Sequence, residues 1–184
     1  MAKLDKLITL AFLSPTQSDH WVNRLTAYVS QHPFCHVELF FESVQQSFSI
    51  MLGETAGFRP KNLSNPNYTL ISLCVSAKEY DACLEFCRSV ASQNIAFDDR
   101  GMWLSWFFAP ACCSDQSSQV KGVTFCSKII TEALQFGGLR EVEHAVPSQV
   151  TPGVLYQLLR GSNRIACNSV PFKRQAFVVL STMR

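Results

Sequence analysis

The chain has 184 residues, 47% of them hydrophobic, which predicts one compact domain over residues 1–184 with a sizeable buried core. The 16 lysines and arginines nearly balance the 14 aspartates and glutamates, so the formal charge is +2. Only 16% of the residues are charged, so we expect no basic face for a phosphate backbone and no nucleic-acid partner.

The first predicted element is a strand over residues 7–13. A basic beginning and a short apolar run are also features of a signal peptide. However, Asp5 interrupts the basic flank and Ser14-Pro15 ends the run as a turn, so we interpret it as a buried strand. No apolar stretch of the sequence approaches the roughly 18 residues that cross a bilayer. We therefore expect a cytoplasmic protein with no transmembrane segment.

A helix is predicted over residues 18–30, because the segment begins with Ser18 and Asp19, residue types that favour the N-cap position of a helix. Its expected inner face consists of Trp21, Val22, Leu25, Tyr28 and Val29. Two runs rich in aromatic and branched residues follow, at 34–41 and 47–52, and the short loop between them predicts a hairpin.

The pairing of this hairpin decides which residue faces His36. If the turn is centred on Val44 and Gln45, the numbers of facing residues sum to 89. His36 then faces Gly53, and a shift of one residue or a bulge brings Glu54 opposite it.

A buried strand at 70–75 leads into a helix that continues to about Ala91. Ser76 and Glu79 have the spacing of a capping box at its start. The side chains expected on its buried face are Tyr80, Leu84, Cys87 and Val90.

The last third of the chain contains an aromatic segment at 102–108, which is either core or the apolar wall of a substrate groove. Further on, Ser148 or Thr151 caps a helix that ends at Gly161. Its expected inner face consists of Leu155, Leu158 and Leu159. A final strand is predicted at 175–180. Because strands and helices do not alternate regularly, the pattern predicts an α+β fold with a mostly antiparallel sheet.

The eight cysteines lie mostly in strand-like or helix-like apolar runs, which is typical of reduced thiols in a cytosol-like compartment. Cys83 and Cys87 lie four apart on a predicted helix, and Cys112 and Cys113 are adjacent. There is no CxxC pair, and adjacent cysteines are awkward joint ligands of one tetrahedral ion. We therefore expect no metal and no other cofactor.

Cys126 is the candidate nucleophile. A short β-prone run delivers it to the start of an amphipathic helix, which the Gly137-Gly138 pair ends. Unpaired N–H groups and the helix dipole stabilise a thiolate at a helix N-terminus. The alternative is that Cys126 is a small buried packing residue, as most free cysteines are.

A thiol hydrolase also needs an imidazole and a polar residue that orients the ring. Of the four histidines, His20 and His32 lie in or beside the first helix, and His144 lies in a charged loop. Only His36 lies in a strongly strand-like run, where the backbone fixes the direction of the ring. A strand histidine can equally be a hydrogen-bonded core residue, so both interpretations of His36 stay open.

At these residues the sequence resembles the circularly permuted papain-like cysteine hydrolases of the NlpC cell-wall peptidase superfamily, in the branch of YiiX-like and viral relatives. A histidine opens a strand as His36-Val37-Glu38-Leu39, a second strand reads Ser47-Phe48-Ser49-Ile50, and Phe125-Cys126-Ser127 begins a helix. A Thr151-Pro152 segment with leucines follows, so the resemblance covers residues 34–160. His36 precedes Cys126 by 90 residues, the order of the permuted group.

The resemblance implies a papain-like fold in which Cys126 is the nucleophile and His36 the base. The third residue of this family commonly lies on the strand after the histidine strand, which favours Glu54. Glu38 is the substitute, because it points to the same side of the strand as His36, and Ser49 is a neutral alternative.

The family activity is hydrolysis of amide or ester bonds, or acyl transfer, through an acyl-enzyme. The expected substrate is a peptide, a protein conjugate or a lipid. The alternative function is a catalytically silent module of this fold that binds a protein or lipid partner. Retention of both Cys126 and His36 favours the enzyme.

Overall fold

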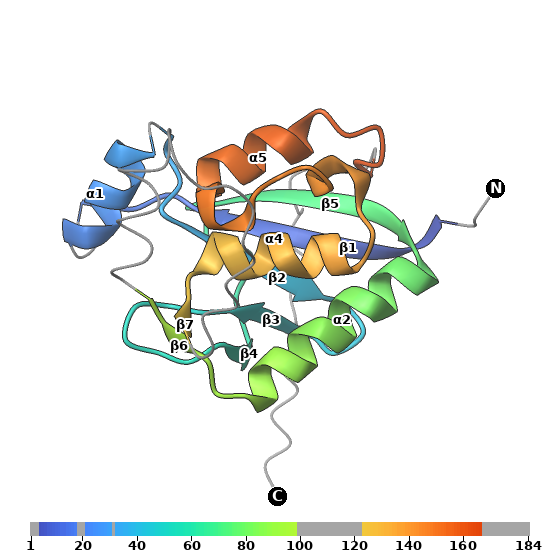
Figure 1. Ribbon diagram of the computed structural model, residues 1–184. Coiled ribbons are helices and arrows are strands. Elements are labelled where there is room, and N and C mark those ends of the chain that lie inside the picture. Colours follow the sequence, from blue (N-terminus) through green and yellow to red (C-terminus); the bar gives the residue numbers. More distant parts are fainter. Residues whose placement is uncertain (1–3, 18–20, 31, 99–122, 167–184) are drawn as a thin grey trace, which may run out of the picture.

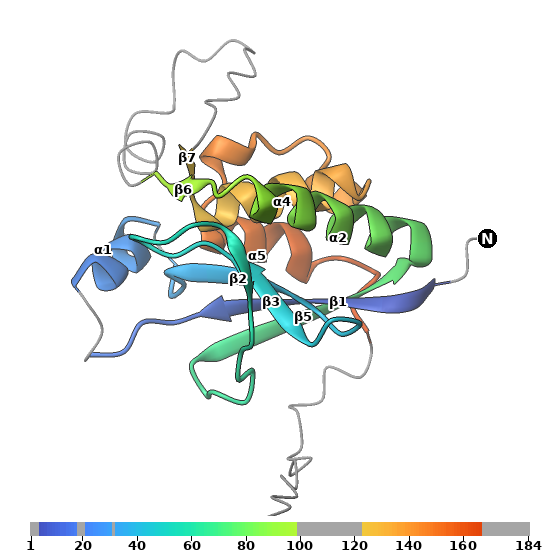
Figure 2. The same cartoon turned by 90° about the horizontal axis from the view of Figure 1, so that it is seen from below.

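The computed structural model describes residues 4–17, 21–30, 32–98 and 123–166. They form an α+β arrangement in which a five-stranded antiparallel sheet packs against helices (Figure 1). Seen from below, α2 (Ala77–Ser92), α4 (Cys126–Phe136) and α5 (Pro152–Arg160) all lie on one side of the sheet (Figure 2). The predicted α+β class and antiparallel sheet are confirmed.

The sheet has the strand order β4-β3-β2-β1-β5, and all neighbouring strands are antiparallel. Its strands are β1 (Leu4–Leu13), β2 (His36–Phe41), β3 (Gln46–Ser49), β4 (Gly57–Arg59) and β5 (Tyr68–Ser76). Four of them are the strands that the sequence predicted, and the short β4 is an addition. The strand predicted at 175–180 lies outside the described residues.

A second, two-stranded parallel sheet pairs β6 (Ala96–Phe97) with β7 (Val123–Thr124). It is tied to the turn that follows β3, because Phe97 N–H donates to the Glu54 carbonyl at 3.1 Å. Only Phe125 separates β7 from α4, so this small sheet fixes the point at which α4 begins.

The hairpin register differs from the prediction. Leu39 pairs with Phe48, so the numbers of paired residues sum to 87 and the turn is centred one residue earlier. The Tyr80 hydroxyl of α2 accepts the Ser43 N–H at 3.0 Å and bonds the Ser43 hydroxyl at 2.7 Å. Gln45 takes a positive φ of 53°. Because the shift in the partner strand is two residues, each side chain keeps the face that was expected.

The helices begin and end close to their predicted limits. Ser76 and Glu79 form the predicted capping box of α2, and Thr151 caps α5 by accepting the Val154 N–H. Gly138 follows α4 with a φ of +79°, the left-handed conformation that favours glycine. Two short 3₁₀ turns, Arg140–Val142 and Pro147–Gln149, connect α4 to α5.

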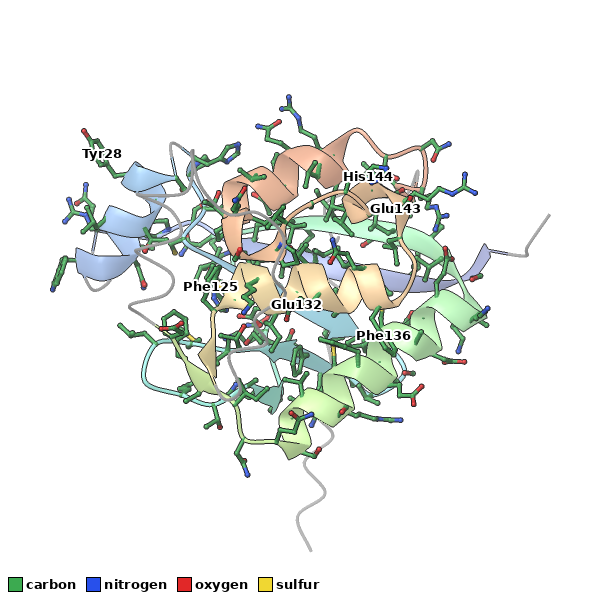
Figure 3. All side chains as sticks on the ribbon, in the orientation of Figure 1. Tyr28, Phe125, Glu132, Phe136, Glu143 and His144 are labelled. Carbon is green, nitrogen blue, oxygen red and sulfur yellow. The ribbon has the colours of Figure 1, made fainter. Side chains whose placement is uncertain are left out.

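Two expected helix faces are wrong in part. On α1 (Trp21–Val29), Trp21 and Tyr28 are 64% and 82% exposed, whereas Thr26 is buried. Figure 3 shows Tyr28 pointing away from the rest of the molecule. On α5, Leu158 is exposed, although Leu155 and Leu159 are fully buried. Among the described residues, no helix is long and apolar enough to cross a membrane.

The core lies between the sheet and α4, which packs against β2 and α2. The buried side chains of α4 include Ile129, Ile130, Ala133 and Leu134. Cys83 of α2 donates its thiol hydrogen to the Ala133 carbonyl at 3.3 Å. α4 is therefore held on two sides, which fixes the position of its first residue, Cys126.

Candidate active site

Cys126 is the first residue of α4 and is 3% exposed. Figure 3 labels the preceding residue, Phe125, where the chain enters the helix. The first intrahelical bond joins the Ile129 N–H to the Phe125 carbonyl at 3.1 Å, so the N–H groups of residues 126–128 precede the helical ladder. These N–H groups place partial positive charge beside the Cys126 sulfur.

The residue after Cys126, Ser127, anchors this end of the helix. The buried Ser127 hydroxyl donates to the Val150 carbonyl at 2.5 Å, and the Thr131 hydroxyl donates to the Ser127 carbonyl at 2.7 Å. The start of α4 is thereby tied to the segment that leads into α5.

His36 is the first residue of β2, pairs with Leu13 of β1 and is 6% exposed. The Cys126 side chain lies within electrostatic and hydrogen-bonding reach of its imidazole. Burial by itself disfavours a charged ring, but the charges of Cys126 and Glu38 more than offset it and raise the pKa of His36 to about 9. The two residues of the predicted pair, 90 positions apart in the sequence, are thus neighbours that favour an imidazolium.

Glu38 lies two residues along β2 from His36 and is fully buried. Its Oε1 atom is 2.9 Å from Lys61 Nζ, accepts the Tyr68 hydroxyl at 2.9 Å and is 3.6 Å from His36 Nε2. Burial alone raises a carboxyl pKa, but His36 and Lys61 together lower the pKa of Glu38 to about 2. Glu38 is therefore ionised at neutral pH.

Two polar atoms of this group stay without a hydrogen bond among the described residues. They are His36 Nε2 and Glu38 Oε2, and both are buried. The 3.6 Å from His36 Nε2 to Glu38 Oε1 is an ion-pair distance, longer than the roughly 3 Å of an N–H···O hydrogen bond. Hydrogen bonds of this kind are often long before substrate binds and tighten in the complex.

Glu54, the residue first expected to orient His36, is engaged elsewhere. It lies in the turn beyond β3, its side chain is 43% exposed, and its carboxylate is 3.0 Å from Arg59 Nη2. The shifted hairpin register and the end of β3 at Ser49 explain this position. Ser49 is buried in β3, where its carbonyl accepts a bond from Arg59 at 3.5 Å. The carboxylate beside His36 is that of Glu38, which was the substitute.

The other candidates have different surroundings. His32 stacks on Phe34 with ring centroids 5.2 Å apart, and its Nε2 atom is 2.7 Å from the Gln157 amide nitrogen. His144 is exposed, and Figure 3 shows it near the turns that follow α4. Burial raises the pKa of Cys83 to about 12 and that of Cys87 well above its usual range, which makes both poor nucleophiles.

Three predicted features lie outside the described residues: His20, the aromatic segment 102–108, and the adjacent Cys112 and Cys113. Within the described ranges, no three histidine, cysteine, aspartate or glutamate side chains gather as metal ligands would.

Sequence reasoning did not find Lys61 and Tyr68. Lys61 lies in the connection between β4 and β5, whose prolines and asparagines are typical of an irregular loop, and Tyr68 is the first residue of β5. One signal was present in the sequence, since Glu38 stands in an apolar strand-like run and a buried carboxylate needs a cation or several donors.

Comparison with known proteins gives no relative: the chain matches no family model, no curated protein and no solved structure.

Proposed function

We propose that this protein is a cysteine-dependent hydrolase of amide or ester bonds. The observation that carries the proposal is the buried His36 imidazole, which has the Cys126 thiol at the start of α4 within electrostatic and hydrogen-bonding reach and the Glu38 carboxylate 3.6 Å from its Nε2 atom. A thiolate and imidazolium pair beside a carboxylate is the arrangement that nucleophilic acyl chemistry uses.

In the first half-reaction the Cys126 thiolate attacks the carbonyl carbon of the substrate and a C–S bond forms. The N–H groups at the start of α4 are suited to stabilise the negative charge that develops on the carbonyl oxygen. His36 then donates its proton to the leaving amine or alcohol as the C–N or C–O bond breaks, which leaves a thioester and a neutral imidazole.

In the second half-reaction neutral His36 takes a proton from water, and the hydroxide attacks the thioester carbon. The C–S bond breaks, the carboxylic acid product leaves, and the thiolate and imidazolium are restored. Glu38 acts throughout as a positioning residue. Its carboxylate stays ionised, and its negative charge stabilises the imidazolium of His36.

We also propose that the fold is the permuted papain-like one. It is supported by a histidine strand that precedes the cysteine helix and by an antiparallel sheet packed against that helix. Among the described residues, the free thiols of Cys74, Cys83, Cys87 and Cys126 suit the reducing conditions of the cytoplasm, where we propose that the protein works.

The test is the rate at which iodoacetamide alkylates Cys126 at pH 7, followed by peptide mass spectrometry so that each thiol is scored separately. We expect His36→Ala to slow alkylation of Cys126 about tenfold or more, because the thiolate loses its counterion. His144→Ala, which removes an exposed histidine, is the matched control and should match the wild type. Equal rates in wild type and His36→Ala would show that Cys126 is not activated and would favour a silent binding module.

A second readout is hydrolysis of p-nitrophenyl acetate. A thioester intermediate predicts a burst of p-nitrophenol equal to the enzyme concentration, and Cys126→Ser should abolish it.

A further inference from the structure

The buried Glu38 carboxylate has a cationic partner that comes from a distant part of the chain. Lys61 stands in the connection between β4 and β5, its side chain is 26% exposed, and its ammonium is 2.9 Å from Glu38 Oε1. A carboxylate removed from water is strongly unfavourable unless it is paired and hydrogen-bonded. Lys61 is therefore a structural requirement of an ionised Glu38, and its position beside the Cys126 and His36 pair gives it a further role.

That role follows from the charges that face this group. Cys126 as a thiolate and Glu38 carry two negative charges, and His36 as an imidazolium and Lys61 carry two positive charges. The Tyr68 phenol, which also contacts Glu38, is neutral, because burial and the charge of Glu38 raise its pKa well above its usual range.

The neighbouring strand adds no charge, because Ala11 and Leu13 of β1 are the residues paired with Glu38 and His36. With Lys61, the group formed by these four residues is neutral after the thiolate has formed. Without Lys61 it would carry one net negative charge, and the thiolate would form against the uncompensated field of Glu38.

Lys61 also helps to set the direction of the carboxylate. Lys61 and Tyr68 both bind Oε1, and Oε2 has no hydrogen-bond partner among the described residues. The carboxylate is thus held at one oxygen, and His36 Nε2, which is likewise without a hydrogen bond, lies 3.6 Å from that same oxygen.

We propose that Lys61 is a positioning residue of this site: its ammonium neutralises and orients Glu38, so that a thiolate can form on Cys126 beside His36. The proposal rests on the proposed function, because it assigns Lys61 a part in activating that nucleophile. Lys61 acts only through Glu38, which is its ion-pair partner in the described part of the chain.

The experiment measures the pH dependence of Cys126 alkylation by iodoacetamide in wild type, Lys61→Met, Lys61→Gln and Lys61→Arg. Loss of the positive charge should raise the midpoint for thiolate formation by about one pH unit, which is roughly a tenfold slower reaction below the midpoint. Lys61→Arg keeps the charge and should keep the wild-type midpoint. Lys61→Gln keeps a hydrogen-bond donor for Oε1, so it serves if Lys61→Met does not fold.

The same change is then made in a Glu38→Gln background. Lys61 loses its partner there and can extend into solvent, so Lys61→Met should shift the midpoint by less than about 0.3 pH unit, a factor of two. The double variant removes both charges of the ion pair, an exchange that proteins often tolerate.

The outcomes separate the two proposals. If wild type reacts no faster than His36→Ala, the proposed function is wrong. If wild type is activated but the neutral Lys61 variants keep its midpoint, only the role of Lys61 is wrong, and any loss of thermal stability they show is structural. An equal shift with and without Glu38 would overturn the claim that Lys61 acts through Glu38.

Discussion

His36 and Glu38 leave the same side of β2, and their Nε2 and Oε1 atoms stand 3.6 Å apart in a site where both residues are buried. The two positions are adjacent on one face of the strand because side chains alternate with a period of two. A single strand thus supplies both the imidazole and its carboxylate, and the tertiary fold brings the Cys126 helix, Lys61 and Tyr68 to them.

Glu38→Gln tests this relationship directly. Removing the negative charge beside the imidazolium should lower the pKa of His36 and slow p-nitrophenyl acetate hydrolysis about tenfold or more. Glu54→Gln is the matched control, because Glu54 is a partly exposed carboxylate paired with Arg59, and it should stay within about twofold of wild type. The reverse result, with Glu54 the more sensitive position, would restore Glu54 as the orienting residue.

The candidate pair could be predicted because its signals are local. The apolar period and the glycine pair of 126–138 placed Cys126 at a helix start, and the branched and aromatic residues of 34–41 placed His36 on a strand. The third residue could not be placed as firmly, since it depends on hairpin register. The turn of that hairpin is held by the Tyr80 hydroxyl, which binds Ser43 from 37 residues away.

The position of Lys61 and the exposed face of α1 likewise could not be predicted from local sequence signals. Whether the ammonium of a loop lysine returns to a buried strand depends on the path of the whole connection, and no spacing in the sequence encodes it. The apolar pattern of α1 indicates a helix but not what packs on it. Trp21 and Tyr28 are exposed, and α1 lies at one end of the molecule, far from α2 (Figure 1).

The close packing behind α4 leads to a second prediction, which concerns stability. A Cβ atom added at Gly137 would overlap Cys83 Sγ and would stand 3.1 Å from the Glu79 carbonyl. Gly137→Ala should therefore lower the free energy of unfolding by about 1–3 kcal/mol in urea titrations. Gly161→Ala is the control, since no described atom lies within 4 Å of the added Cβ there and Gly161 also follows a helix. Equal stability of the two variants would contradict the packing of α4 on α2.

The Ser127 hydroxyl leads to a third prediction, which also concerns stability. Ser127→Ala leaves the Val150 carbonyl without this buried donor, which should cost about 1–3 kcal/mol of unfolding free energy. Ser92→Ala is its control, because the Ser92 hydroxyl bonds a carbonyl at the exposed end of α2. If Ser127→Ala were as stable as Ser92→Ala, Ser127 would not be the anchor of the α4 start.

The fourth prediction concerns the removal of metal ions. Because the proposed chemistry uses a thiolate, dialysis against EDTA should change neither the alkylation rate of Cys126 nor the thermal unfolding midpoint. A slower alkylation of Cys126 or a lower unfolding midpoint after chelation, with recovery on adding zinc, would show that a metal takes part.

The last prediction concerns stability against pH. The pKa of His36 is raised from 6.5 to about 9 in the folded protein, so the folded state binds this proton more tightly than the unfolded chain does. The resulting stabilisation is fully present below about pH 6.5 and is lost as the pH rises through about 9. Glu38 has the opposite sign: its pKa falls from 4.5 to about 2, so its contribution is present above about pH 4.5 and is lost as the pH falls toward 2. Urea unfolding between pH 6 and 10 should therefore show stability falling in wild type and a shallower fall in His36→Ala, with His144→Ala like wild type. A wild-type curve that runs parallel to the His36→Ala curve over this range would show that His36 is not held as an imidazolium, and the proton donor of the proposed mechanism would be lost.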